Sequence, residues 1–291
     1  MNAIEFSQQK ELKEVITGHI KTSAIYCFGR NATAYSSSRK IYSDKELQKE
    51  HSHLYLLVFV QETKENAGSD ISDKIKTKTQ GSLTATVLIH HVQSLKDLCQ
   101  DQQFFFWQIM QNAELLFQDI NKPPYLNISE TPKRNLNSTS HYIAWRKNNI
   151  ATIWGWVYND DDASSSDEVK MSAPHQIVEQ ICLSLIRVYI GYTPNHFALE
   201  YLFNLCEYFT TITTDFFPRQ TREDKSIFKL LKQQPNTLRF SKANDVDYLY
   251  YQVVEERCKN FKNQAEILIQ NEINRQNEVE NEPVKIENEP V

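Results

Sequence analysis

Glycine is scarce in this chain, with 6 residues among 291. Loops that cradle phosphate groups through their backbone need several glycines close together, so the composition argues against such a loop. Long apolar runs are missing as well: the longest, residues 54–60, is far shorter than the roughly 20 residues that span a bilayer. Glu5, Glu11 and Glu14 interrupt the N-terminus, which is unlike a signal peptide. We expect a cytoplasmic protein without a membrane partner.

The cysteines lack the pattern of a disulfide framework or a metal site: there are five, an odd number, and none are in CxxC spacing. This favours buried thiols over a disulfide framework or a metal site. The net charge is −5, and residues 271–291 hold six Glu against Arg275 and Lys285. The rest of the chain is therefore nearly neutral and has no general electrostatic footprint for nucleic acid. We expect residues 271–291 to form a disordered acidic tail.

The N-terminal part reads as a small α/β domain over residues 1–120. A helical pattern at 7–20 precedes a buried strand at 24–28 that stops at Gly29, and further strands are expected at 54–60 and 83–89. We expect polar connecting segments at 31–50 and 61–81 and a helix over 94–117. Three prolines then mark residues 121–138 as a linker between domains.

The C-terminal part, residues 139–270, reads as an all-α bundle, so the predicted fold class is α+β. Its centre is a helical hairpin over 175–209, with two amphipathic patterns on either side of a Gly-Tyr-Thr-Pro-Asn turn. Residues 150–158 suit a strand as well as a helix by their pattern. A capping-box sequence from Thr221 to Asp224 predicts a further short helix, and the last helix is expected from about 241 to 270.

The hairpin resembles the central part of HEPN domains, which are small helical bundles of prokaryotic RNases, toxins and nucleotide-associated proteins. The residues that carry the resemblance are His175, Gln176, Glu179, Leu185, Gly191, Tyr192, Pro194, His196, Phe197 and Leu199. The resemblance implies a helix over 150–158 and a homodimer through the helical bundle. In the version most similar to this chain, the bundle follows a minimal nucleotidyltransferase-like domain.

The first domain departs from that family at its reactive positions. Where the family places a phosphate-binding Ser after the glycine turn, Arg30 follows Gly29. Where active members carry two metal-binding Asp on the next strand, this chain has His53 and Tyr55. Mg²⁺ needs hard oxygen ligands such as carboxylates, so we expect no metal, no cofactor and no nucleotidyl transfer. Gly29 and Arg30 remain candidates for holding a nucleotide phosphate without metal.

Two further histidine positions bear on chemistry. His90 and His91 follow a strand, and adjacent strand residues point to opposite faces, so the pair is a poor metal chelate. His175 and Glu179 share a helical face and form either a polar site of the bundle or a structural contact.

RNase-active HEPN domains carry an Arg followed by a His in the last core helix. Here Arg239 fits the Arg, but Asn244 stands where the His belongs, and an amide cannot transfer protons near neutral pH. An enzyme would have to use the non-standard set Arg187, His196 and Arg239. We therefore expect a non-catalytic module that binds a nucleotide, RNA or a protein, for which the resemblance suggests a toxin–antitoxin or defence context. Metal-independent RNA cleavage is the alternative.

Overall fold

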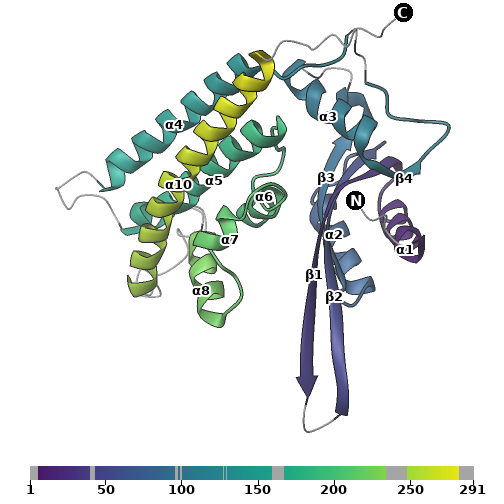
Figure 1. Cartoon of the computed structure of the whole chain (residues 1–291), viewed down its shortest axis with the longest axis horizontal. Coiled ribbons are helices and arrows are strands. Elements are labelled where there is room, and N and C mark those ends of the chain that lie inside the picture. Colours follow the sequence, from purple (N-terminus) through teal and green to yellow (C-terminus); the bar gives the residue numbers. More distant parts are fainter. Residues whose placement is uncertain are drawn as a thin grey trace, which may run out of the picture. The chain divides into compact units, whose positions relative to one another are not determined.

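The computed structural model describes residues 6–39, 43–95, 98, 100–126, 128, 130–158, 167–233 and 248–281 (Figure 1). The chain divides into two compact units, Met1–Arg134 and Asn135–Val291. A four-stranded sheet lies in the first unit, and the second unit is helical, so the predicted α+β class is confirmed. Arg239 and Asn244 lie outside the described residues. Within those residues no helix has the length and apolar character needed to cross a membrane.

The first unit is a mixed sheet with strand order β3-β2-β1-β4. Strands β1–β2 and β1–β4 pair antiparallel, and β2–β3 pair in parallel through the crossover helix α2. Its elements are α1 (Phe6–Thr17), β1 (Thr22–Arg39), β2 (Ser43–Val60), α2 (Ala67–Lys78), β3 (Leu83–His91), the 3₁₀ turn η1 (Val92–Leu95), α3 (Gln100–Asn112) and β4 (Glu114–Gln118).

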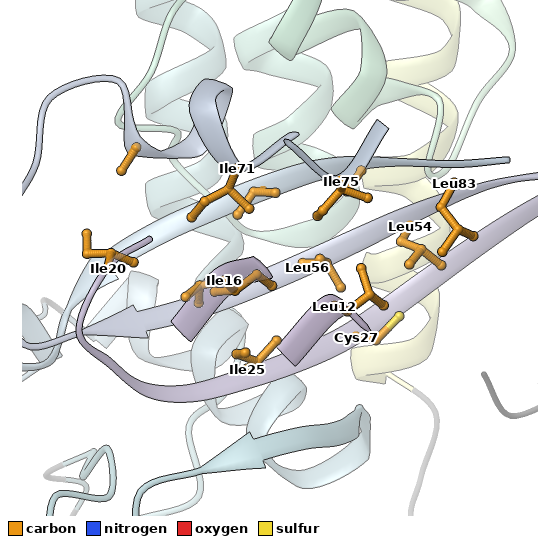
Figure 2. Close-up of a cluster of buried hydrophobic side chains, with 14 of the residues drawn as sticks. Leu12, Ile16, Ile20, Ile25, Cys27, Leu54, Leu56, Ile71, Ile75 and Leu83 are labelled. Carbon is orange, nitrogen blue, oxygen red and sulfur yellow. The ribbon is translucent and has the colours of Figure 1, made fainter. Parts of the chain in front are cut away.

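One face of the sheet packs on α1 and α2 and forms the main core of this unit (Figure 2). Alternate strand residues point to this face, because side chains on a strand alternate between the two sides. The core is formed by residues of α1, α2 and three strands together with Ile20, which lies between α1 and β1. They are Leu12, Ile16, Ile20, Ile25, Cys27, Leu54, Leu56, Val58, Val60, Ala67, Ile71, Ile75, Leu83, Ala85 and Val87. We call this side of the sheet the helix face.

The opposite face of the sheet carries aromatic side chains from the strands and from α3. Phe105 lies edge-on to Phe28 with ring centroids 6.2 Å apart, and Phe106 lies 6.0 Å from Phe59. These are contacts of a packed core. We call this side the aromatic face.

Two polar segments that the sequence analysis left without structure are regular elements. Most of residues 31–50, expected as a connecting segment, form strand: residues 31–39 belong to β1 and residues 43–50 to β2, and the paired strands continue past the ends of β3 and β4 (Figure 1). Residues 61–81, expected as a surface loop, contain α2, whose Ala67, Ile71 and Ile75 are buried. Three apolar residues on one side suffice for a short helix to pack on a sheet. The low average hydrophobicity of residues 61–81 does not reveal such a pattern.

The expected helix over 94–117 is also only partly right. α3 ends at Asn112, and residues 114–118 form β4, which pairs with β1. Likewise β1 does not stop at Gly29, where we expected a turn. Its pairing with β2 has a register shift between Cys27 and Gly29, so the glycine lies at an irregularity inside the strand.

In the second unit α5 is the central helix and contacts α4, α6, α8 and α10. Most of its residues from 172 to 188 are buried. The elements are α4 (Leu136–Tyr158), α5 (Asp167–Ile190), α6 (Leu199–Cys206), α7 (Ile212–Phe216), α8 (Arg222–Leu231) and α10 (Tyr248–Asn281). The helical reading of 150–158 is confirmed by α4.

A proline inside α5 is accommodated by a contact from α10. Pro174 has no N–H, so it leaves the carbonyl of Lys170 without its usual helical partner. The hydroxyl of Tyr251 donates to that carbonyl at 2.9 Å. The replacement bond lets α5 begin at Asp167, eight residues before the start expected at His175.

The predicted hairpin turn is present, with one difference in its second arm. Gly191 ends α5 with φ 70° and donates its N–H to the Arg187 carbonyl at 3.0 Å, as a left-handed cap does. The second arm is split into α6 and α7 rather than one helix. The capping box at the start of α8 is confirmed, with Thr221 and Asp224 bonded reciprocally.

The first part of the segment predicted as a disordered tail, residues 271–291, is helical. Residues 271–281 belong to α10, with Glu272 and Gln276 buried. Gln276 Nε2 donates to the Val188 carbonyl at 2.8 Å, which anchors this part of α10 to α5. The prediction failed here because the helix docks through polar rather than apolar side chains. Residues 282–291 lie outside the described part of the chain.

The cysteines agree with the expectation of buried thiols. Among the described residues Cys27, Cys182, Cys206 and Cys258 are buried and free, and Cys99 lies outside them.

Candidate functional site

Arg30 is placed on the helix face of the sheet, at the end of the core. It pairs with Leu54 across the β1–β2 ladder, and Leu54 belongs to the helix-face core. Its guanidinium donates from Nε and Nη2 to the hydroxyl of Ser52, at 3.2 and 3.0 Å. Ser52 is itself fixed, since its backbone N–H donates to the Ser82 carbonyl at 2.9 Å.

The Arg30–Ser52 pair offers hydrogen-bond donors and hardly any acceptor. A guanidinium has five N–H groups, and Ser52 engages two of them, so three remain. The oxygen of Ser52 accepts both bonds, which leaves its own hydrogen for donation. No carboxylate of the described residues forms an ion pair with Arg30. Such a group of donors matches the several acceptor oxygens of an anion.

His53 lies on the opposite, aromatic face, where its half-buried ring contacts two threonines of β3. Nδ1 lies 2.8 Å from the Thr84 hydroxyl, and Nε2 lies 2.9 Å from the Thr86 hydroxyl. A neutral imidazole has one N–H and one lone pair, so one nitrogen donates and the other accepts. Both nitrogens are therefore engaged, and neither can bind a metal while the two threonines hold the ring.

Tyr55 completes this closed network. Its hydroxyl accepts from Asn31 Nδ2 at 3.2 Å, and its ring centroid lies 5.0 Å from that of His53. The side chain is fully buried. His53 and Tyr55 thus contact each other through their rings, and their polar atoms are engaged by other residues of the sheet. Among the residues that the structure describes, no cluster of three or more His, Cys, Asp or Glu could bind a metal.

Ser52, Thr84 and Thr86 were not singled out from the sequence as site residues. Ser52 became recognisable only through the pairing register, which places it beside Arg30. Thr84 and Thr86 alternate along β3 with Leu83 and Ala85 of the helix face. That alternation was the only sign in the sequence that the two threonines face away from the helix-face core. The parallel pairing of β2 and β3 then places both on the same side as His53.

His90 and His91 separate as adjacent strand residues do. The His90 ring packs edge-on against Phe106 at 4.8 Å, and burial lowers its pKa from 6.5 to about 4. His91 Nε2 contacts the Gln61 carbonyl at 2.9 Å. The two rings have different surroundings, as expected for adjacent residues of a strand.

In the helical unit Arg187 is buried and engaged inside the bundle. Its exposed fraction is 4%, and Nη1 donates to the Gly191 carbonyl at 3.3 Å and the Thr193 hydroxyl at 3.4 Å. Nη2 donates to the Ser138 hydroxyl at 3.4 Å. These bonds join α5 to the following turn and to α4. Arg187 therefore has a structural position.

His196 has different neighbours from Arg187. It is an exposed residue of the turn, and its ring packs edge-on against Tyr201 with centroids 5.0 Å apart. Desolvation lowers its pKa. The third member of the non-standard set, Arg239, lies outside the described residues. The described geometry thus gives no shared contact between Arg187 and His196.

His175 and Glu179 lie on one side of α5 with Nε2 and Oε2 4.0 Å apart, which is too long for a hydrogen bond. His175 Nδ1 contacts the Leu231 carbonyl at 3.1 Å, so Nδ1 carries the proton in the neutral ring. Desolvation lowers the pKa of His175 and raises that of Glu179, the latter opposed by Arg146. His175 is 4% exposed, and its contact with the Leu231 carbonyl links α5 to the end of α8.

Comparison with protein-family models, with curated proteins and with solved structures finds no match to this chain. The argument for a function therefore comes from the geometry of the residues.

Proposed function

We propose that this protein is a non-catalytic nucleotide-binding module, in which Arg30 and Ser52 hold a phosphate group of the ligand without a metal ion. The observation that carries the proposal is the pair's surplus of donors: three N–H groups of the guanidinium and the Ser52 hydroxyl hydrogen. Phosphate supplies acceptor oxygens and negative charge, and bonds from a guanidinium to phosphate are among the stronger hydrogen bonds in proteins.

Nucleotidyl transfer is left out of the proposal because the residues that would bind metal are absent. His53 and Tyr55 stand in place of carboxylates, and both are engaged in the aromatic-face network. They also point to the side of the sheet opposite Arg30. A phosphate held at Arg30 would therefore lie on the other side of the sheet from both of these residues.

Cleavage of RNA by Arg187, His196 and Arg239 receives less support. A metal-independent cleavage needs a proton-transferring group and a cation that meet at one phosphate. Arg187 is buried among Gly191, Thr193 and Ser138, whereas His196 is exposed beside Tyr201.

The test is a thermal-shift screen of the full chain with ATP, GTP, pyrophosphate and short RNAs, each with and without Mg²⁺. A ligand that binds only the folded state raises the melting temperature by mass action. We expect a shift with a nucleotide that is independent of Mg²⁺, and its loss in Arg30→Ala. Lys76→Ala removes an exposed cation of α2 in the same unit and is expected to keep the shift.

Two results would count against the proposal. One is a shift that appears only with Mg²⁺, which would mean that the chain binds a metal–nucleotide complex. The other is an equal shift in wild type and Arg30→Ala, which would place the ligand elsewhere.

A further inference from the structure

Arg146 of α4 is held by two aromatic rings and two neutral hydrogen-bond acceptors. The central carbon of its guanidinium lies 4.8 Å from the centre of the Tyr142 ring and 4.5 Å from that of the Trp145 ring. Nη1 donates to Oε1 of Gln180 on α5 at 2.6 Å, and Nη2 donates to the Tyr142 hydroxyl at 2.9 Å. These contacts fix the position of the cation between the two helices.

The charge of Arg146 is not balanced by an ion pair with any of the described residues. Burial raises the pKa of Glu179, and Arg146 opposes that rise, so the two side chains interact without forming an ion pair. Within α4 the only charged residues are Arg146 and Lys147, and there is no Asp or Glu, although the chain has a net charge of −5. Lys147 lies 4.0 Å from Glu266 of α10, which leaves Arg146 as the unpaired cation of this helix.

Arg146 and Tyr142 have hydrogen-bond donors left for a ligand. Each terminal nitrogen of the guanidinium carries two hydrogens and uses one of them, so two N–H groups remain. The Tyr142 oxygen accepts from Arg146 and keeps its own hydrogen. Nε of Arg146 is buried without a hydrogen-bond partner, which makes an anion beside this guanidinium favourable.

Trp145 adds open aromatic surface beside these donors. Its exposed fraction is 55% even though Arg146 lies over its ring. Tryptophan and arginine are the side chains most enriched at the energetic centres of protein interfaces. Trp156 of the same helix is 76% exposed, and no Arg or Lys of the described residues lies over its ring. The two tryptophans of α4 thus differ in having a cation beside them.

We propose that Tyr142, Trp145 and Arg146 form a docking site for an acidic segment of a partner protein. A carboxylate of the segment binds the free N–H groups of Arg146, and a neighbouring apolar or aromatic side chain packs on Trp145. Charge complementarity selects this partner, because one unpaired guanidinium matches one carboxylate. A nucleic-acid backbone would need a row of basic residues, which α4 does not have.

The site lies in the second unit and shares no residue with the Arg30 site, so it goes beyond the proposed function. The chain has four tryptophans, whose indole N–H signals can be followed by nuclear magnetic resonance in the full chain, with Trp145→Phe identifying its own signal. The probe is the acetylated and amidated peptide Asp-Glu-Phe-Glu-Asp. We expect a saturable shift of the Trp145 signal and none of the Trp156 signal. The amide peptide Asn-Gln-Phe-Gln-Asn should bind at least about ten-fold more weakly, because bonds from a cation to a neutral acceptor are weaker.

Substitutions separate Arg146 from its neighbour in the sequence. Arg146→Gln removes the cation and should lose the shift, whereas Lys147→Gln makes the same change of net charge at an exposed position and should bind like wild type. Circular dichroism checks that both variants keep their helices. Since Arg146 also joins α4 to α5, the comparison of the two peptides matters most, because it needs no substitution at Arg146.

Three results would overturn the proposal: a Trp145 signal that neither peptide shifts, equal binding of the acidic and the amide peptide, or unchanged binding in Arg146→Gln. A Trp145 shift with short single-stranded RNA but not with the acidic peptide would also reject it, in favour of nucleic acid as the ligand. All of these are read at Trp145 and do not involve Arg30, so they are distinguishable from a failure of nucleotide binding.

Discussion

The polar side chains on the two faces of the N-terminal sheet differ in how fully their hydrogen-bonding groups are used. On the helix face the Arg30–Ser52 pair has donors left over and no carboxylate partner among the described residues. On the aromatic face both ring nitrogens of His53 are engaged by threonine hydroxyls, and the Tyr55 hydroxyl accepts from Asn31. A polar group that is hydrogen-bonded within the protein stabilises the fold. Hydrogen-bond donors that the protein does not use can bind an anion. The difference supports the proposal that the end of the helix face, beside Arg30 and Ser52, binds an anion, while the polar groups of the aromatic face have a structural role.

The largest effect on stability is expected from the apolar core of the helix face. Leu56→Ala should lower the free energy of unfolding by about 2–5 kcal/mol, because Leu56 is fully buried between the strands and the two helices. Urea unfolding followed by circular dichroism measures this. Leu115→Ala, at a position 48% exposed on β4, should cost less than about 1 kcal/mol. Equal losses for the two variants would contradict the placement of the core.

The aromatic face should make stability depend on pH through His90. Burial lowers its pKa from 6.5 to about 4, so the folded state keeps the ring neutral where the unfolded chain takes up a proton. His90 therefore leaves the free energy of unfolding undiminished above pH 6.5. As the pH falls from 6.5 towards 4, the free energy of unfolding decreases by an amount on the order of 1–3 kcal/mol. Urea unfolding of wild type and His90→Gln at several pH values between 4 and 7 tests this, since the variant should show a flatter dependence. Parallel curves would show that His90 titrates normally in the folded state.

His53→Ala should damage the closed network without touching the binding face. The buried hydroxyl of Thr86 loses its partner, which should lower the free energy of unfolding by about 1–2 kcal/mol. Nucleotide affinity should stay that of wild type, because His53 and Arg30 lie on opposite faces. Titration calorimetry beside urea unfolding measures both quantities. A large loss of affinity with unchanged stability would reverse the roles given to the two faces.

Ser52→Ala should have the smallest effect of these substitutions, and it tests how much Ser52 adds to binding by Arg30. It removes one hydroxyl donor and the oxygen that orients the guanidinium. We expect nucleotide affinity to fall several-fold, corresponding to the loss of about 1 kcal/mol for one hydrogen bond. Ser82→Ala, at the neighbouring residue that contacts Ser52 through its backbone only, is the control that should bind like wild type. A gain in affinity for Ser52→Ala would mean that Ser52 competes with the ligand for Arg30.

The sequence was a good guide where apolar periodicity is strong. The strand at 83–89, the central hairpin, the cap at Gly191 and the capping box at Thr221 are all present. It failed where polar residues form strands by pairing, as in residues 31–39 of β1 and 43–50 of β2, because the partner of a strand is not visible in the local sequence pattern. The same limit applies to the tail, where Gln276 docks α10 through one bond to Val188.

For the candidate site the sequence predicted residues but not their arrangement. It gave Arg30 as a candidate for phosphate and showed that His53 and Tyr55 cannot replace carboxylates. The shift in register between Cys27 and Gly29, which helps set the face that Arg30 occupies, has no signature in the sequence beyond the glycine itself. The homodimer through the bundle and the nucleotide or RNA ligand stay predictions, and Arg239 lies outside the described residues.

The central claim is that Arg30 binds phosphate without metal, and isothermal titration calorimetry of ATP into the full chain in the presence of EDTA tests it most directly. The account predicts saturable binding to wild type, at least ten-fold weaker binding to Arg30→Lys, which keeps the charge but loses the forked geometry, and none detectable to Arg30→Ala. Binding of equal strength to all three proteins, or binding that requires Mg²⁺, would contradict it.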